Sequence, residues 1–267
     1  MKLPNAPLME VVFELHWDVP KTGQASSSVS FGYDPGFDAF KGAFDAAVAA
    51  AGYTVQEIVA QPGPTIANAV VCRFRKGDGQ PFPLMQIGHG VFACNISTDY
   101  EWSDFKAFCL EGLGHILACY PRTPISPFRP SRIELRYVDV FNEELLGHKS
   151  LTNFLKTNSK ISHDGLGFMD TDVFTGGAQG QLVVRRSIAK AELGWFRFDI
   201  ANATANNKDS ILLTSRVVKD ADFALDDWTE NTSDAISDWL SEANKITSEF
   251  FKSFISDDLM ARFKQDK

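Results

Sequence analysis

The most regular hydrophobic pattern of the chain covers residues 226–255, close to the C-terminal end. Apolar side chains recur there at spacings of three and four residues, the period of an amphipathic α-helix. This stripe includes two Trp and two Phe side chains, which is too much apolar surface to leave in water. We therefore expect a broad surface, a β-sheet, to lie across it. The residues of the stripe are Trp228, Ile236, Trp239, Leu240, Ala243, Ile246, Phe250 and Phe254.

The first half of the chain alternates between the two-residue period of strands and the period of helices. Residues 18–33 are rich in Gly and Ser and are expected to form a loop. Gly88-His89-Gly90 interrupts the last predicted strand, and two glycines around one residue indicate a bulge, a bend or a split into two shorter strands. The predicted order is strand, helix, three strands and helix, at residues 10–17, 34–51, 54–60, 66–75, 84–96 and 102–120.

The same order returns after a stiff, proline-rich connector at residues 121–130. The sequence therefore predicts an α+β fold of two similar β-α-β-β-β-α halves, residues 1–122 and residues 123–267. The halves either pair edge to edge in one continuous domain, a curved antiparallel sheet packed on long helices, or form two separate small domains. Before the long helix, the second half has a strand at 132–141, a short helix at 151–157, a loop-rich stretch at 161–179 and strands at 181–191, 195–201 and 210–218.

Composition narrows the class of protein. A chain of 267 residues can bury a sizeable core, and its net charge of -8 argues against a general nucleic-acid binder. No apolar run approaches the roughly 20 residues of a membrane span, and the N-terminal segment has no signal-peptide pattern. The four cysteines form no CxxC pair, so we expect reduced core thiols in a cytoplasmic protein rather than a metal site or disulfides.

Four segments of the chain carry a resemblance. Asn5-Ala6-Pro7 and Glu10 open the first strand, and the likeness continues at residues 85–95, 100–105 and 132–139. These segments resemble a sporadically distributed prokaryotic family of unknown function, whose members open with an Asn-Ala-Pro segment, an acidic residue and a first strand. The family has Gly-Pro-Gly where this chain has Gly88-His89-Gly90, so the resemblance gives no support to His89 as a family-wide catalytic base. It implies no activity, cofactor or catalytic residue. The patchy distribution implies an accessory role tied to mobile elements or to defence against them.

His89 is the sharpest single candidate for a functional residue. Between two glycines it could approach a ligand closely and titrate near neutral pH. As a general base in a hydrolase or nuclease it would need carboxylates from elsewhere in the chain and a nucleophile. The alternative is a histidine with a structural role in a bulge or turn. Gln86 and Asn95 lie on the same bent strand and join His89 as candidate binding residues.

Cofactor motifs are missing from the sequence. The five histidines include no spacing typical of zinc ligands, and the acidic stretch around Asp170 and Asp172 has no EF-hand spacing. The glycine-rich residues 176–180 fit neither a Walker A motif nor a dinucleotide-binding motif, and no nucleophile elbow occurs. We therefore expect no cofactor, no metal and no assigned catalytic residue.

Six arginines lie on predicted strands of the second half, and Arg136 and Arg197 are the two candidate binding residues among them. They form either a solvated face with cross-strand charge pairs, which would use Glu134 and Asp199, or a surface for an anion, an acidic partner or RNA. The six are Arg132, Arg136, Arg185, Arg186, Arg197 and Arg216.

The C-terminal residues carry a second apolar surface. Ser256 is a candidate cap for a short final helix with Leu259, Met260 and Phe263, which would close over the core or meet a second subunit. Taken together, the sequence favours a cytoplasmic, non-catalytic binding protein whose partner is another protein or a second copy, or a small anionic ligand. The alternatives are the enzyme with His89 and the RNA- or anion-binding protein with the strand arginines.

Overall fold

The computed structural model describes residues 5–24, 30–59, 65–77, 79, 81–97, 100–121, 128–147, 151–160, 174–176, 181–187, 193–205, 207–220 and 230–265. The acidic stretch around Asp170, most of the glycine-rich stretch 176–180 and the start of the predicted last helix lie outside the described residues. In the part of the chain that is described, no helix is both long and apolar enough to cross a membrane.

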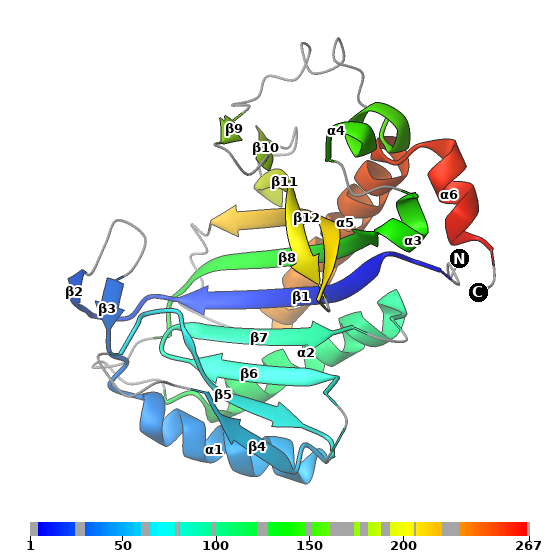
Figure 1. Cartoon of the computed structure of the whole chain (residues 1–267). Coiled ribbons are helices and arrows are strands. Elements are labelled where there is room, and N and C mark those ends of the chain that lie inside the picture. The colour runs from blue at the N-terminus through cyan, green and yellow to red at the C-terminus, as the bar shows by residue number, and fades with distance from the viewer. Residues whose placement is uncertain are drawn as a thin grey trace. The chain divides into compact units, whose positions relative to one another are not determined.

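The fold is α+β and is built on one large, open antiparallel sheet (Figure 1). The hydrogen-bonded order of its strands is β4-β5-β6-β7-β1-β8-β12-β11-β10-β9. These strands are β1 (Leu8–Trp17), β4 (Val55–Ile58), β5 (Val70–Arg75), β6 (Leu84–Gly88), β7 (Val91–Ile96), β8 (Pro130–Asn142), β9 (Phe174–Gly176), β10 (Gln181–Ser187), β11 (Trp195–Ala205) and β12 (Lys208–Asp220). A separate two-stranded sheet pairs β2 (Lys21–Gln24) with β3 (Ser30–Gly32).

The chain divides into two compact units, which differ from the predicted halves in that each takes in segments of the other half. Unit 1 comprises Met1–Val11, Leu135–Lys219 and Trp239–Lys267, and unit 2 comprises Val12–Glu134 and Asp220–Asp238. Strands β1 and β8 therefore contribute residues to both units.

In unit 2, two helices cover one face of the strands. They are α1 (Phe37–Ala50) and α2 (Trp102–Cys119), and Figure 1 shows α2 behind β6 and β7. As the spacing predicts, α1 buries Phe37, Phe40, Phe44 and Val48. Helix α2 approaches β7 closely at Gly112, where an added Cβ would come within 2.4 Å of the Phe92 ring.

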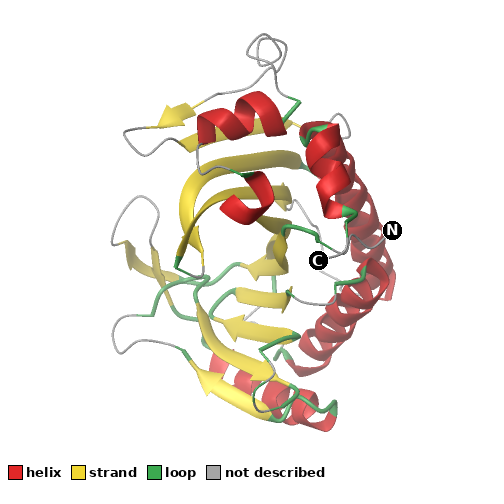
Figure 2. Cartoon of the chain, turned by 45° about the vertical axis from the view of Figure 1, so that its right-hand side comes forward, coloured by secondary structure: helices red, strands yellow, loops and turns green. Residues whose placement is uncertain are grey.

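In unit 1, the long helix α5 (Glu230–Phe254) contributes residues 239–254 and packs on strand β11. Its Phe250 ring lies 4.8 Å from Phe196 and 4.7 Å from Phe198, between ring centroids. Trp239 is only 5 % exposed, and its indole N–H donates to the carbonyl of Leu193 at 3.1 Å. The prediction that a sheet covers the apolar stripe of this helix is confirmed at Phe250, whose ring partners lie on β11. Trp239 is buried beside Leu193, which precedes that strand. Figure 2 shows helices in red against strands in yellow.

The split at Gly88-His89-Gly90, one of the predicted alternatives, is confirmed: residues 84–96 form two strands, β6 and β7, joined by a tight turn at His89 and Gly90. Four strands rather than three therefore follow α1. Other predicted elements are wrong in detail. Part of the predicted loop at 18–33 forms β2 and β3. The loop-rich stretch contains the short strand β9. A short helix, α3 (Glu143–Leu146), was not predicted, and the helix predicted at 151–157 is α4 (Leu151–Asn153) followed by a π-helical turn, η1 (Phe154–Asn158).

The C-terminal tail closes over the core of unit 1. Ser256 caps the last helix, α6 (Asp257–Phe263), by accepting a hydrogen bond from the backbone N–H of Leu259 at 3.3 Å, as predicted. Leu259 and Phe263 are fully buried, and the Phe263 ring lies near those of Phe141 and Phe251. These two side chains therefore do not offer the apolar surface that dimerisation through the tail would use.

The two glycines of α2 give a matched test of this packing. Gly112→Ala should lower the free energy of unfolding by about 1 to 3 kcal/mol, because its Cβ would press on the fully buried Phe92. Gly114→Ala adds a methyl group where no atom lies within 4 Å, and should raise stability by about 0.5 to 1 kcal/mol through helix propensity. Urea unfolding of both variants measures the difference. Equal effects would contradict the close approach of α2 and β7.

Candidate functional site

His89 occupies a two-residue turn between β6 and β7. Gly88 pairs with Val91 across the hairpin, and a Cβ at Gly88 would lie 1.9 Å from the carbonyl oxygen of Ala69. Gly90 has φ +83°, in the left-handed region that favours glycine. Both glycines are therefore required by the backbone of this turn, which explains the Gly-His-Gly sequence.

The imidazole of His89 is buried in unit 2 against aromatic rings. Its centroid lies 4.1 Å from that of Phe37 and 5.3 Å from that of Tyr33. Nδ1 lies 3.2 Å from the backbone nitrogen of Asp34 and accepts its hydrogen bond, so the neutral ring carries its proton on Nε2. Burial lowers the pKa of His89 below its ordinary value, against the opposing effect of the Asp34 and Asp38 charges.

The carboxylate of Asp34 connects three elements of unit 2. It accepts hydrogen bonds from the Trp17 indole on β1 at 3.2 Å, from the Tyr120 hydroxyl after α2 at 2.8 Å and from the backbone N–H of Gly36 at 2.8 Å. In a catalytic dyad, a carboxylate accepts the Nδ1–H of the histidine. Here Nδ1 is itself an acceptor and faces a backbone N–H, so the arrangement matches the structural alternative for His89.

Gln86 and Asn95 are brought together on the face of β6 and β7 that points away from α2. Gln86 is 7 % exposed and Asn95 6 % exposed. The amide Nε2 of Gln86 donates to Oδ1 of Asn95 at 2.7 Å, and its Oε1 accepts from Nε of Arg73 on β5 at 3.0 Å. The sequence prediction included the two amides but missed Arg73.

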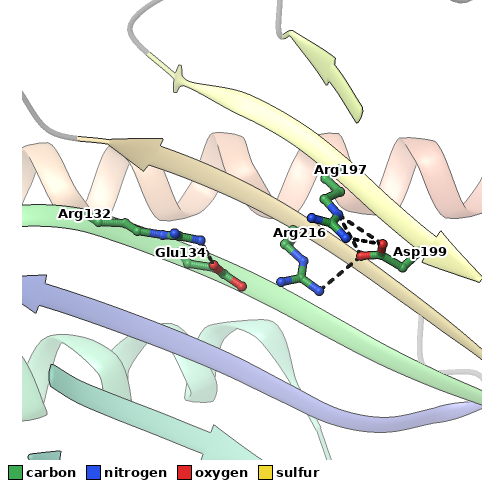
Figure 3. Close-up of polar contacts among 5 residues, drawn as sticks. All are labelled: Arg132, Glu134, Arg197, Asp199 and Arg216. Carbon is green, nitrogen blue, oxygen red and sulfur yellow. Dashed lines mark hydrogen bonds and ion pairs between the residues drawn. The ribbon is translucent and has the colours of Figure 1, made fainter. Parts of the chain in front are cut away.

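Arg197 belongs to a charged cluster on β11 and β12 of unit 1. Its Nε and Nη2 both donate to Oδ1 of Asp199, at 3.0 and 2.6 Å, and Nε also lies 3.0 Å from Oδ2. Arg216 Nη2 donates to Oδ2 of the same carboxylate at 3.2 Å. Figure 3 shows the two guanidinium groups converging on Asp199. The cluster lies opposite the face on which Phe196 and Phe198 contact α5.

The other strand arginines are distributed differently. In unit 2, Arg132 Nη2 donates to Oε2 of Glu134 at 2.5 Å (Figure 3). Arg136, in unit 1, is half-buried, and by strand alternation it lies on the face opposite Tyr137, whose hydroxyl donates to Asn244 of α5. The side chains of Arg185 and Arg186 lie outside the described residues. Arg132, Arg197 and Arg216 are thus paired with carboxylates, as the charge-pair alternative predicts. Of these pairs, only that of Arg216 with Asp199 joins two strands, however, and both carboxylates are buried rather than solvated.

Asp139 is a buried carboxyl group that sequence reasoning did not single out. It is 5 % exposed on the face of β8 shared with Tyr137 and Phe141, and no hydrogen bond from a described residue reaches it. Burial raises the pKa of Asp139 to about 7. The sequence held one signal for a buried Asp139: the alternation of β8 places this residue on the apolar face of the strand.

Among the described residues, no group of three or more His, Cys, Asp or Glu side chains could hold a metal ion. The four cysteines are free thiols, with Cys72, Cys94 and Cys109 buried and Cys119 half-buried. Comparison with models of known protein families, with curated proteins and with solved structures finds no match for this chain.

The lowered pKa of His89 predicts a pH-dependent stability. The folded state favours the neutral imidazole of His89. The stability that this ring contributes is therefore complete above about pH 6.5, the ordinary pKa of histidine, and is lost as the pH falls below that value. His89→Gln should be less stable at neutral pH but lose less stability between pH 7.5 and pH 5.5. Urea unfolding over this range measures the slopes. An unchanged slope in His89→Gln would contradict the assignment of a neutral, buried His89.

Asp139 should have the opposite dependence. The fold favours the protonated carboxyl group, so stability is lost as the pH rises from 3.8, its ordinary pKa, through about 7. Asp139→Asn should therefore stabilise the protein at pH 8 by on the order of 2 to 4 kcal/mol, and by little at pH 4. The control Asp258→Asn removes an exposed carboxylate in the first turn of α6 and should lower stability by less than about 1 kcal/mol. Equal effects of Asp139→Asn at pH 4 and pH 8 would exclude a raised pKa.

Proposed function

We propose that the protein is a non-catalytic binding module that recognises an acidic segment of a partner protein. The site is the cluster of Arg197, Asp199 and Arg216 on β11 and β12. The proposal rests on one observation. Asp199 accepts hydrogen bonds from Nε and Nη2 of Arg197, which form one edge of the guanidinium group.

This contact with Asp199 leaves a second edge of the guanidinium group, formed by Nη1 and Nη2, for a ligand. A guanidinium has five N–H donors, and the edge formed by Nη1 and Nη2 matches the two oxygens of a carboxylate. Asp199 occupies the other edge, and Nη1 has no hydrogen-bond acceptor among the described residues. The Arg197 side chain is 36 % exposed. A ligand therefore meets a donor pair that is already oriented, so less conformational entropy is lost on binding.

The charge distribution favours an acidic protein segment over a nucleic acid. The net charge of -8 opposes the approach of any polyanion, and most strongly that of a phosphate backbone, which carries a charge on every nucleotide. A single carboxylate meets less repulsion and can be held by short-range hydrogen bonds. Arg132, Arg197 and Arg216 also share their charge with Glu134 or Asp199 instead of presenting it to a polyanion. Arginine anchors that are held in place are typical of protein interfaces.

The proposal places the module in the cytoplasm, which the free thiols of the four cysteines support. The resemblance of the N-terminal segments supports an accessory role connected with mobile elements or defence. We also propose that the two halves are an architectural repeat, corrected to four strands after the first helix of each half. Counted outward from the neighbours β1 and β8, strands β7 to β4 follow on one side and β12 to β9 on the other, which supports it.

The test is capture of partners by the full chain from a lysate of its native host. Wild-type protein should retain an acidic protein, which is then purified and measured with the wild type by calorimetry at two salt concentrations. Arg197→Gln should weaken this interaction by roughly ten- to hundred-fold, because the ligand loses its bidentate donor pair.

Lys245→Gln is the matched control, because it removes one positive charge from the exposed side of α5 in unit 1. It should bind the partner with wild-type affinity. Full binding by Arg197→Gln, or release of the captured material by nuclease treatment, would overturn the proposed function.

A further inference from the structure

Unit 2 contains a second oriented arginine, Arg73 on β5. Its Nε donates to Gln86 at 3.0 Å, and Gln86 in turn donates to Asn95 at 2.7 Å. The three residues lie on three neighbouring strands, β5, β6 and β7, and form a line of hydrogen bonds across one face of the sheet. The opposite face carries Phe74, which contacts Phe44 of α1.

Burial of the two amides costs free energy that apolar side chains at these positions would not cost. The line of hydrogen bonds offsets that cost, and it also fixes the position of the Arg73 guanidinium. Buried polar groups that hold an exposed donor in one orientation are typical of binding sites, where a rigid second layer supports the contacting group.

The orientation leaves the ligand-binding edge of Arg73 open. Gln86 occupies Nε, and neither Nη1 nor Nη2 has a hydrogen-bond acceptor among the described residues. These two nitrogens form the edge that receives a carboxylate with two parallel hydrogen bonds. Arg73 is half-buried, so part of this residue is exposed to solvent.

The neighbouring charges select the ligand. Glu57 on β4 lies directly opposite Arg73 in register, but its carboxylate accepts a hydrogen bond from Arg75 at 3.2 Å. Register and alternation place no other charged residue on this face of β4, β5, β6 and β7. On these four strands, two arginines and one glutamate leave one positive charge, which matches a single carboxylate better than a phosphate dianion. On β1, the next strand of the sheet, the carboxylate of Glu14 lies 3.0 Å from Nε2 of His16.

We propose that Arg73, positioned by Gln86 and Asn95, binds one carboxylate group of an acidic peptide through its Nη1–Nη2 edge. Arg73 touches the ligand, whereas Gln86 and Asn95 are positioning residues. The site shares no residue with the Arg197 cluster, so the two proposals stand or fall separately.

The experiment is an NMR titration of the full-length protein with N-acetylglutamate amide, and with inorganic phosphate at the same ionic strength. The Nε–H signal of Arg73, identified by its absence in Arg73→Lys, should shift and saturate with the glutamate derivative. Arg73→Lys keeps the charge but not the paired donors. Its titration, followed through the backbone amide signal of Gln86 because the Arg73 signal is absent, should give about ten-fold weaker binding than the wild type measured through the same amide. Gln86→Leu keeps Arg73 but removes its orientation, and should weaken binding by a similar factor of about ten.

Arg129→Gln is the control, because it removes an exposed arginine of the same unit outside the site and should leave the titration unchanged. An Arg73 signal that does not respond overturns the proposal, as does equal affinity in Arg73→Lys. Tighter binding of phosphate than of the glutamate derivative overturns the carboxylate assignment. A response of Arg197 alone would leave the function proposed for unit 1 intact while excluding this site.

Discussion

Successive side chains of a strand point to opposite faces, so a helix that buries one face of a strand leaves every second residue on the other. This constraint arranges both candidate sites. On β11, Phe196 and Phe198 contact α5, so Arg197 lies on the remaining face. On β6, Met85 and Ile87 are fully buried, and Gln86 lies between them on the other face. The apolar core thus decides which polar groups can meet each other.

Polar side chains on the remaining face form hydrogen-bonded networks with one another. Surface ion pairs contribute little to stability, since the charges are screened and long side chains lose entropy. Asp199 and Gln86 are both nearly buried, however, and each fixes an arginine through its Nε atom. Partly buried networks of this kind cost desolvation energy. The two binding proposals rest on this cost, which apolar side chains at the same positions would not have.

The sequence was sufficient for groupings that depend on local periodicity. It predicted the apolar stripe of α5 and the cap of α6 at Ser256, because each follows from residue type and spacing along one element. It could not predict that Arg73 meets Gln86, since that contact depends on the register between β5 and β6, which shifts between Val70 and Cys72. Helix α3 was missed although Asn142 caps its start and Gly147 ends it in the left-handed conformation, both local signals.

The two oriented arginines differ in the group that holds them, and the difference has a physical consequence. Asp199 is a carboxylate, so it orients Arg197 while reducing the positive potential that a ligand meets. Gln86 is neutral, so it orients Arg73 without reducing its charge. Under the two binding proposals, recognition at Arg197 therefore depends more on hydrogen-bond geometry, and recognition at Arg73 more on charge. Because coulombic attraction between exposed groups is screened by salt, binding at Arg73 should weaken more steeply with ionic strength than binding at Arg197.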